Sequence, residues 1–533
     1  MPIREESNRK TIVFTPHDAH GHVNSMLALA GELRALGCRT IFITNDATTP
    51  KSFGHELFLL GGDQTSALPN NEQDAYLKAK LFTSNTGDKS FSYNVELAGD
   101  SVDDETFRTF EHNASFWTLV YERMCNSDDK LEELLISLKP DLVVCDCGPP
   151  RPAVARLSQD SYAKKVANLR GGLRCLTLMS VAPLEIYYYT ELKQVQRGSR
   201  QVPMPWFGFP IRRQMSSDEH SKHMDCIKQA QTASGQIKAL LKIAELSHFD
   251  DINSASMTDA QYARLNLNES KWLNIYMFPK ELDYNNEFRI KLDKSKWIRV
   301  DALVRPILST SQPLDDKSQH LLDKLELWKQ SGLRESHRTI YLSMGTLVST
   351  DLGVMELVLQ QVFTCLKEQV GWRFAVSLGV RHVELEKTFK DEFDHWQNKE
   401  ARLITSGWWP QPEVFKRHLA DAYVVHGGNN TICELFHYSE GQLPPLVVVP
   451  GIVDQLDIAR RIEELGLGVA LPVGRLMRED ATGKKDLLLL NALRHALKMG
   501  HLVDGQHNLS TFRSGRSDAS ECARLIKIKL DED

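Results

Sequence analysis

One glycine-rich turn in this chain carries side chains that could hold an anion and a sugar. Residues 422–425 form a short apolar run typical of a buried strand, and His426 and two glycines break it. Asn430 and Thr431 then open a helical pattern, where backbone N–H groups and side-chain donors favour an anion. Glu434 lies one turn further on the same helical face, and its carboxylate can accept hydrogen bonds from two sugar hydroxyls. The combination indicates a site for a nucleotide diphosphate.

A longer motif surrounds this turn. Its ten members are Trp408, Pro410, Gln411, His426, Gly428, Asn430, Thr431, Glu434, Asp454 and Gln455. In type and spacing they resemble the donor-binding signature of family 1 UDP-glycosyltransferases, in its plant form. Two departures stand out. The segment 437–445 is about four residues longer than the usual turn, and Ile458 replaces an asparagine that often follows the Asp-Gln pair.

The resemblance implies a role for each donor residue. Trp408 stacks on uracil, Gln411 bonds the ribose or the base, and Glu434 takes the ribose hydroxyls. The diphosphate is cradled by His426, Gly428, Asn430 and Thr431, with Gly345 and Thr346 from a second glycine turn. Asp454 and Gln455 hydrogen-bond sugar hydroxyls, which favours glucose. The family implies no obligatory metal and no other cofactor, because the helix dipole and neutral donors replace the cation.

Sugar transfer to a hydroxyl also needs a base, and His22 is the candidate. It follows the first predicted strand, where the resembled family keeps its base. Asp146 matches the family position for the carboxylate that orients such a histidine. Cys145 and Cys147 flank Asp146 and are expected to project to the other face as ordinary buried thiols. His17 and His20 share the turn with His22, and their roles stay open.

The elements around these residues predict an α/β fold. Residues 11–15 and 40–44 read as buried strands, and 26–36 as the helix between them. Residues 131–138 predict a helix, and 141–145 a strand that delivers Asp146 at its carboxyl end, where open sheets bind ligands. The first turn lacks the G-x-G-x-x-G fingerprint, so a dinucleotide oxidoreductase is disfavoured. Residues 185–275 give a helical and polar pattern.

The second half repeats the alternation of strands and helices. The first half ends with a strand predicted at 297–305. In the second half, strands are predicted at 339–344, 373–377 and 401–405, with an amphipathic helix at 354–366. We therefore predict two facing, doubly wound (Rossmann-like) domains with parallel sheets, which is the GT-B arrangement of the resembled family. The expected boundaries are 1–302 for an acceptor-binding domain, 303–325 for a linker, 326–515 for a UDP-sugar-binding domain, and 516–533 for a C-terminal tail or helix.

Composition narrows the partners and the compartment. The 533 residues carry a formal net charge of −6, which gives no electrostatic reason to propose nucleic acid. The nine cysteines are few and odd in number, which favours a reducing compartment over a disulfide framework. The charged N-terminus and the absence of a long apolar run predict a cytoplasmic protein without a signal peptide or an integral membrane segment. The oligomeric state cannot be read.

The predicted function is inverting transfer of a hexose, with glucose favoured, from a UDP-sugar to a hydroxyl of a small lipophilic acceptor. Such enzymes serve detoxification and secondary metabolite glycosylation. Aromatic residues that could line the acceptor pocket are Trp117, Tyr187, Tyr188, Tyr189 and Trp206. The alternatives are a non-catalytic nucleotide-sugar or lipophile-binding protein on the same fold, another UDP-sugar enzyme such as an epimerase or a polymerising transferase, and a metal-dependent enzyme that uses the cluster of His17, His20 and His22.

Overall fold

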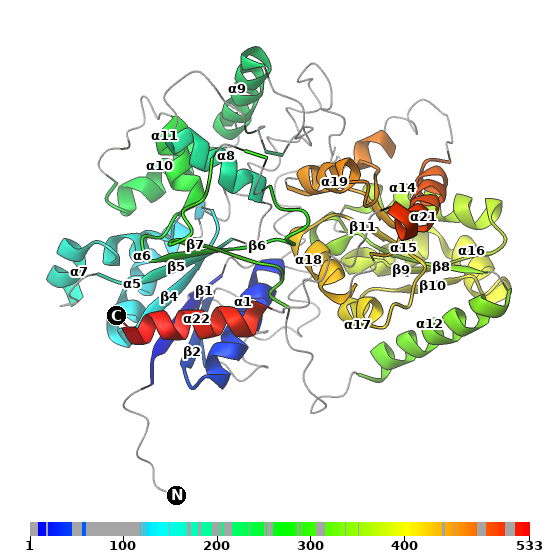
Figure 1. The fold of residues 1–533 in the computed structure, drawn as a ribbon, viewed down its shortest axis with the longest axis horizontal. Helices are drawn as coiled ribbons and strands as arrows, with labels where there is room; N and C mark the ends of the chain where they lie inside the picture. Colours follow the sequence, from blue (N-terminus) through cyan, green and yellow to red (C-terminus); the bar gives the residue numbers. More distant parts are fainter. Residues whose placement is uncertain are drawn as a thin grey trace, which may run out of the picture.

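The computed structural model describes two lobes, each built on a parallel sheet (Figure 1). It describes the chain apart from residues 1–8, 17–19, 45–55, 60–117, 168–171, 195–201, 207–215, 253–258, 305–314, 477–486 and 507–517, residue 533 and some shorter gaps. The predicted α/β fold of two doubly wound domains is confirmed.

The N lobe holds a seven-stranded sheet in the order β3-β2-β1-β4-β5-β6-β7. Its strands are β1 (Thr11–Thr15), β2 (Arg39–Thr44), β3 (Glu56–Leu59), β4 (Leu142–Asp146), β5 (Cys175–Met179), β6 (Leu273–Met277) and β7 (Trp297–Val300). Its described helices are α1 (His20–Ala35), α5 (Asp128–Leu138), α6 (Pro152–Leu157), α7 (Asp160–Ala167), α8 (Pro183–Gln194), α9 (Ser217–Ala233), α10 (Gln236–Leu246) and α11 (Asp259–Leu267).

The C lobe holds a six-stranded sheet in the order β10-β9-β8-β11-β12-β13. Its strands are β8 (Arg338–Ser343), β9 (Trp372–Ser377), β10 (Leu403–Ser406), β11 (Ala422–Val425), β12 (Leu446–Val448) and β13 (Val469–Ala470). The helices of this half are α12 (Asp316–Glu335), α13 (Gly345–Val348), α14 (Leu352–Glu368), α15 (His382–Thr388), α16 (Lys390–Phe393), α17 (Gln411–Lys416), α18 (Asn429–Tyr438), α19 (Asp454–Glu464), α21 (Leu488–Gln506) and α22 (Asp518–Glu532).

Each sheet is buried on both faces because its central strands are apolar on both sides. In β1, Ile12 and Phe14 enter one core with α1, while Val13 enters another with α5 and α6. In β8, Leu342 and Tyr341 likewise belong to different cores. Parallel sheets need this double cover, since their crossover helices lie on both faces.

The strand orders place a switch point in each sheet. In the N lobe the chain runs outward through β1, β2 and β3, and then β4 pairs with the other side of β1. In the C lobe β11 pairs with β8 in the same way. Connections leave in opposite directions at such a point and open a crevice at the carboxyl ends of the two strands, where ligands bind. His22, Asp146, Gly345 and His426 lie at or just after the carboxyl ends of these four strands.

The last helix returns to the first lobe. Helix α22, the red helix in Figure 1, contacts α1 and β7 of the N lobe. Its Ala523, Ile526 and Leu530 are buried in the core that also holds Ile12 and Phe14. Residues 516–533, predicted as a tail or helix, therefore include a helix that belongs to the N lobe. At the other boundary, α12 begins at Asp316, within the segment predicted as a linker.

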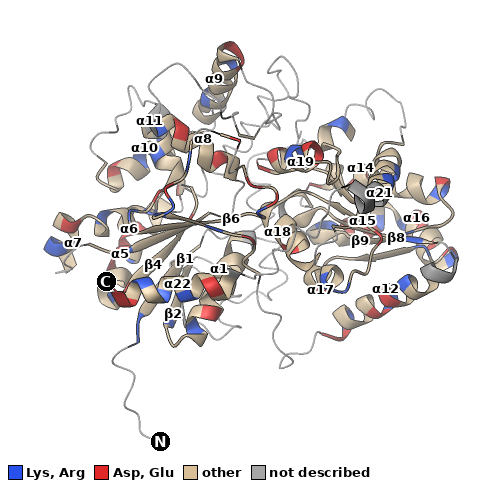
Figure 2. Ribbon diagram, viewed as in Figure 1, with Lys and Arg blue, Asp and Glu red and all other residues tan. Residues whose placement is uncertain are grey.

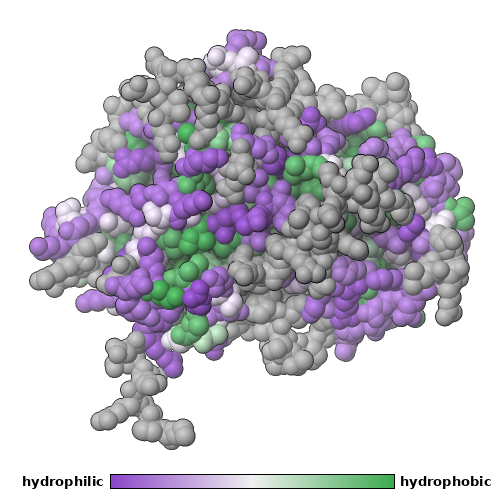
Figure 3. All heavy atoms as spheres, viewed as in Figure 1, coloured by the Kyte–Doolittle hydropathy of each residue, from purple (hydrophilic) through white to green (hydrophobic). Residues whose placement is uncertain are grey.

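The surface carries mixed charges. Lys and Arg are interspersed with Asp and Glu along the described helices (Figure 2), and hydrophilic side chains cover most of the described surface on the face in Figure 3, between small apolar groups. Among the described residues, no helix is both long and apolar enough to cross a membrane.

Several strands were not predicted, among them β3, β5, β6 and β13. Strand β5 and strand β6 complete the N-lobe sheet beside β4, and β6 lies at the end of the stretch predicted to be helical. The apolar run of β6 is interrupted by Asn274, which is fully buried and bonds Ser270 through both of its side-chain ends. A polar residue inside a buried strand interrupts the continuous apolar run by which such a strand is predicted.

Candidate active site

His22 and Asp146 meet at the N-lobe switch point. His22 lies in the first turns of α1, after β1, and Asp146 is the last residue of β4. The Nδ1 atom of His22 and the Oδ1 atom of Asp146 are 2.8 Å apart. The same Oδ1 accepts a hydrogen bond from the backbone N–H of Cys147 at 2.8 Å, and the Asp146 side chain is 3% exposed. The carboxylate is therefore fixed, and it directs the Nε2 edge of the His22 ring away from β4.

This arrangement controls the protonation of His22. Burial lowers the pKa of the imidazole, but the charge and hydrogen bond of Asp146, with a contact to Cys147, outweigh burial and raise the pKa well above 6.5. The ring remains 18% exposed. A histidine held this way is a strong base once its proton has left, and the imidazolium that forms in proton transfer is stabilised by the carboxylate.

Cys147 lies beside the pair, contrary to the prediction that it projects to the other face. Its Sγ atom is 3.9 Å from Nδ1 of His22. Strand β4 ends at Asp146, so the strict alternation of side chains stops there and the next residue turns back to the same side. Burial and the charge of Asp146 raise the pKa of the Cys147 thiol to about 11, so it stays protonated. Cys145, inside the strand, enters the core below the sheet as predicted.

His426 and two glycines form a close cradle at the C-lobe switch point. Gly345 follows β8 with a positive φ of 66°, and a Cβ added there would lie 2.3 Å from Cε1 of His426. A Cβ on Gly428 would lie 2.3 Å from Nε2 of the same ring. Burial lowers the pKa of His426 to about 4, so the ring is neutral, and its Nδ1 atom is buried without a hydrogen-bond partner. Glycine is required at both positions to let the backbone approach this ring.

Helix α18 begins directly beyond this cradle. Gly428 is its N-cap and supplies no side chain, so no side chain caps the first backbone N–H groups. Asn430 is half-buried at this end and Thr431 is buried. Unsatisfied N–H groups and the positive end of the helix dipole favour a diphosphate. Asn429, the first residue, instead reaches the N lobe, where its Nδ2 donates to the carbonyl oxygen of Met277 at 2.8 Å.

The predicted ribose and base ligands also come together. The Nε2 atom of Gln411 donates to Oε2 of Glu434 at 3.1 Å and to Oγ1 of Thr431 at 3.4 Å. Trp408 is 48% exposed, so its indole offers an open face, whereas Trp409 is buried in the core and donates to Val376. These side chains follow β10 and line α18, next to the cradle.

The predicted sugar ligands begin α19. Asp454 is half-buried, and Gln455 is buried with its Oε1 accepting from the backbone N–H of Gly451 at 3.0 Å. Glu185 in α8 of the N lobe belongs to the same surroundings. Burial, with the charges of Asp454 and Asp457, raises the pKa of Glu185 to about 8. The predicted sugar ligands therefore act electrostatically on a carboxyl of the opposite lobe.

Some predicted residues lie elsewhere. His17 and Trp117 lie outside the described residues, as do the side chains of His20 and Thr346. Tyr187, Tyr188 and Tyr189 are buried in the core that spans both lobes, so they do not form an open pocket wall. Among the described residues, the group with metal-ligand character is His22, Asp146 and Cys147, whose ligand atoms lie within 4.8 Å of one another.

Sequence reasoning missed three residues of this region. Asn429 has no predicted role in the motif, although it contacts the other lobe. Glu185 and Arg461 carry no motif, and charged residues in helical patterns are usually exposed. The burial of Arg461, and the position of the half-buried Glu185 near Asp454 and Asp457, become visible only in the folded chain.

Comparison with known proteins agrees with this geometry. Residues 315–499 match the family model described as UDP-glucoronosyl and UDP-glucosyl transferase. The match covers about a third of the chain, so this part of the protein is similar to UDP-glycosyltransferases. The matched range contains every residue predicted to bind the donor, from Gly345 to Gln455.

Individual members of the UDP-glycosyltransferase family match shorter stretches. NDP-glycosyltransferase YjiC of Bacillus subtilis (strain 168) is 43% identical over 63 residues, which are 12% of this chain and 14% of that protein. UDP-glucuronosyltransferase 1A1 of Rattus norvegicus is 25% identical over 180 residues, 34% of this chain and 28% of that protein. The matched stretches thus span less than a third of the length of these curated relatives.

Solved structures extend the likeness in fold to the whole chain. A UDP-glucosyltransferase from Polygonum tinctorium capable of glucosylating indoxyl, in complex with 3,4-dichloroaniline, superposes with a TM-score of 0.52. The sequence identity is 11%, and the superposition covers 98% of this chain and 99% of that chain. At this identity the likeness concerns the fold alone, which is the two-lobed GT-B fold of glycosyltransferases.

Proposed function

We propose that this protein is an inverting UDP-glycosyltransferase that moves a hexose from a UDP-sugar to a hydroxyl of a small lipophilic acceptor. The observation that carries the proposal is the contact of 2.8 Å between His22 and Asp146 at the N-lobe switch point. This pair lies in the lobe opposite the donor motif, and contacts such as that of Asn429 with Met277 join the carboxyl ends of the two sheets. A base in one lobe and a donor site in the other suit a reaction in the crevice between them.

The proposed reaction is a direct displacement. Nε2 of His22 takes the proton of the acceptor hydroxyl while the oxygen forms a bond to the anomeric carbon. The bond from that carbon to the diphosphate oxygen breaks, and its electron pair leaves with UDP. One displacement inverts the anomeric centre. Asp146 stabilises the imidazolium that results, and it does not itself take the proton.

The leaving diphosphate needs stabilisation where its negative charge develops. The uncapped N-terminus of α18, with Asn430, Thr431 and the cradle of Gly345, Gly428 and His426, supplies neutral donors for this purpose. We propose that Trp408 stacks on the uracil and that Gln411 and Glu434 hold the ribose. The proposal includes no obligatory metal and no other cofactor.

Glucose is the proposed sugar because Asp454 and Gln455 begin α19 beside the crevice. A glucuronate would bring a carboxylate next to Asp454 and Asp457, and like charges at close range repel. The names of the relatives include both glucosyl and glucuronosyl transferases, so this choice rests on the residues of this chain. The proposed class of acceptor, a small lipophilic molecule with a hydroxyl, would suit a role in detoxification or in secondary metabolite glycosylation.

The test is transfer itself. Purified protein is incubated with UDP-glucose and a panel of phenols and alcohols, and the products are analysed by mass spectrometry and by the anomeric coupling constant in NMR. We expect a β-glucoside from the α-linked donor, and a His22→Ala variant that binds UDP normally but transfers no glucose. UDP binding by the wild type without transfer to any acceptor would favour a non-catalytic binding protein, and conversion of the UDP-sugar without an acceptor would favour an epimerase.

A further inference from the structure

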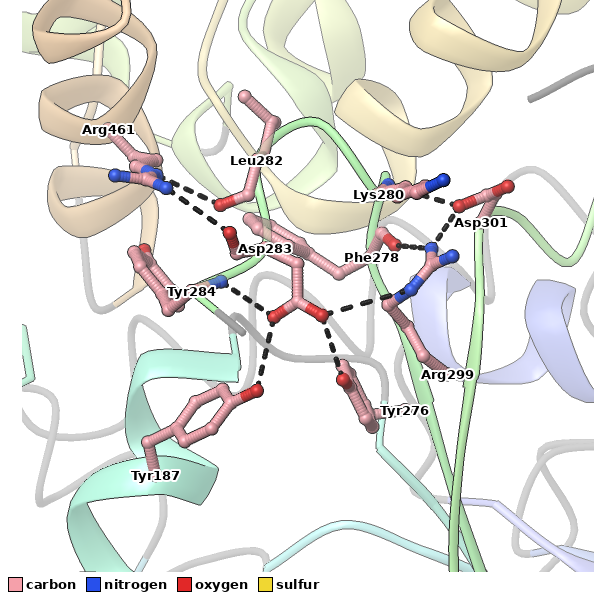
Figure 4. Close-up of polar contacts among 10 residues, drawn as sticks. All are labelled: Tyr187, Tyr276, Phe278, Lys280, Leu282, Asp283, Tyr284, Arg299, Asp301 and Arg461. Carbon is pink, nitrogen blue, oxygen red and sulfur yellow. Dashed lines mark hydrogen bonds and ion pairs between the residues drawn. The ribbon is translucent and has the colours of Figure 1, made fainter. Parts of the chain in front are cut away.

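Arg461 of α19 is buried in the opposite lobe. Its Nε donates to the carbonyl oxygen of Leu282 at 2.9 Å, and its Nη2 donates to the carbonyl oxygen of Asp283 at 3.2 Å (Figure 4). The same Nη2 donates to the carboxylate of Glu287 at 2.5 Å. The guanidinium lies 4.7 Å from the ring centre of Tyr284. Arg461 is only 2% exposed. A buried cation is stable only when it is paired and hydrogen-bonded, and the N lobe supplies every partner named here.

The N-lobe segment that receives Arg461 is itself fixed. The Asp283 carboxylate accepts from the hydroxyl of Tyr276 at 2.9 Å, from the backbone N–H of Tyr284 at 2.7 Å and from the hydroxyl of Tyr187 at 3.5 Å. Nε of Arg299 lies 3.8 Å from the same carboxylate. Figure 4 shows these side chains converging from two strands and a helix on one carboxylate. The carbonyl groups offered to Arg461 therefore belong to a rigid receptor.

Helix α19 connects this contact to the sugar end of the donor site. Arg461 follows Asp454 by seven residues, which is two helical turns, so the two residues lie on the same face about 10 Å apart. Asp457 lies between them, and its Oδ2 accepts from the backbone N–H of Trp206 in the N lobe at 2.6 Å. Trp206 adopts a positive φ of 76°, an unfavourable conformation for a tryptophan, at this contact. The face of α19 that carries Asp454 is therefore held by the N lobe at two points.

Other contacts also join the lobes. Asn429 of α18 bonds Met277, and one continuous core contains Tyr284 and Phe278 of the N lobe together with Ile458 of α19. Loss of the Arg461 contacts would leave these joints in place. The contacts of Arg461 thus constrain the orientation of α19, in addition to the packing and hydrogen bonds that hold the two lobes together.

We propose that Arg461 is a positioning residue for the sugar transfer, which docks α19 on the N lobe so that Asp454 and Gln455 meet the sugar at a fixed place relative to His22. The inference rests on the proposed function. It assigns the N lobe a part in donor selection, because the segment 278–287 determines where the sugar ligands of the C lobe lie.

The test compares substitutions at two adjacent arginines of α19. Arg461→Met keeps the length and the apolar stem of the side chain but removes the donors, and Arg461→Lys keeps the charge with fewer donors. Arg460→Met is the matched control, because Arg460 pairs with Glu463 of its own helix at 2.7 Å on the surface. For each variant we would measure UDP affinity by calorimetry, transfer kinetics with UDP-glucose and UDP-galactose, and thermal unfolding.

For Arg461→Met we expect UDP affinity within about twofold of the wild type, since the nucleotide ligands follow β8, β10 and β11, together with a kcat at least tenfold lower. The ratio of kcat/KM for UDP-glucose to that for UDP-galactose should fall at least threefold, because misplaced sugar ligands distinguish the two epimers poorly. Arg461→Lys should recover part of both losses, and Arg460→Met should match the wild type.

Wild-type kcat and donor ratio in Arg461→Met would overturn the inference, and so would an equal loss of UDP affinity and kcat, which indicates general damage to the C lobe. If Arg461→Met does not fold, the same measurements are made on Arg461→Lys and Glu287→Gln. A ratio of kcat/KM for UDP-glucose to UDP-galactose that is unchanged in both variants would overturn the inference. Failure of the proposed function is distinguishable, because then the wild type itself transfers neither sugar.

Discussion

Replacement of Asp146 by asparagine should slow sugar transfer without weakening the binding of UDP. Asparagine has the same shape, and its side-chain oxygen can still accept from the backbone N–H of Cys147, as the carboxylate does at 2.8 Å. The substitution therefore removes mainly the negative charge that faces His22. The imidazolium formed when His22 takes the acceptor proton loses its counter-charge.

The size of the effect follows from the geometry. The nearest atoms of the pair are 2.8 Å apart, which places the centres of charge roughly 4 Å apart. At an effective dielectric constant of about 20, opposite unit charges at that distance attract by about 4 kcal/mol. Because the His22 ring is 18% exposed, we take a range of about 2–4 kcal/mol. Each 1.4 kcal/mol is about tenfold in rate, so kcat should fall between about 30-fold and about 1,000-fold.

The pH profile provides a second readout. The pKa of His22 is raised well above 6.5 by Asp146, so wild-type activity should rise with pH as the base loses its proton. In Asp146→Asn the pH at which activity rises should be lower than in the wild type. The two proteins are therefore compared by the kcat that each reaches at high pH, on the plateau of its pH–rate profile. Asp141→Asn is the matched control, because Asp141 directly precedes the same strand and accepts a hydrogen bond from the backbone N–H of Thr11, away from the site. A plateau kcat within threefold of the wild type, or a rise in activity at the same pH as in the wild type, would refute the reasoning.

Three further predictions concern the cradle, the crevice and the chemistry. In Gly345→Ala the new methyl group would lie 2.3 Å from the His426 ring, at a residue with a positive φ. We therefore expect a free energy of unfolding lower by at least about 1–2 kcal/mol in denaturant unfolding, and UDP binding at least tenfold weaker by calorimetry. Normal UDP affinity would contradict the role of the cradle. Glu185→Gln should change the pH dependence of stability. Since burial and the charge of Asp454 raise the pKa of Glu185 to about 8 in the folded protein, the wild type loses stability as pH rises from about 4.5 through 8, and the variant should gain on the order of 3 kcal/mol relative to it between pH 5 and pH 9 in urea unfolding. Dialysis against EDTA should leave transfer unchanged, and loss of activity that zinc restores would favour a metal site that includes His22.

The sequence predicted the parts of the site that depend on short-range pattern. The apolar runs that form β1, β4, β8 and β11 are uninterrupted, and the polar residues after them occupy the carboxyl ends of parallel strands. Because the strand order of a doubly wound sheet is restricted, residues after the first and fourth strands must meet at the switch point. The pairing of His22 with Asp146 was predicted from the family resemblance, and the strand order explains why the two residues meet although they are separated by more than a hundred residues.

The remaining features depend on long-range packing, which leaves little trace in local sequence. Asn274 interrupts the apolar run by which β6 could have been predicted. The fold tolerates this buried amide because it is hydrogen-bonded to Ser270. Arg461 lies in a helix with several charged residues, a sequence pattern typical of an exposed helix. Its burial depends on the segment around Leu282, almost two hundred residues earlier in the chain. Cys147 turned toward His22 because the strand ended one residue before it, and strand ends are the least predictable boundaries.

The return of α22 to the first lobe makes the C lobe an insertion within the N lobe. The chain from α12 to α21 is contiguous and can complete its own sheet while synthesis continues, whereas the N-lobe core stays open on one side until residues 518–532 arrive. During translation, the second lobe would therefore finish folding before the first, the reverse of their order in the gene. A chain truncated before Asp518 would keep the strands of the C-lobe sheet and would leave the N-lobe core open on one side.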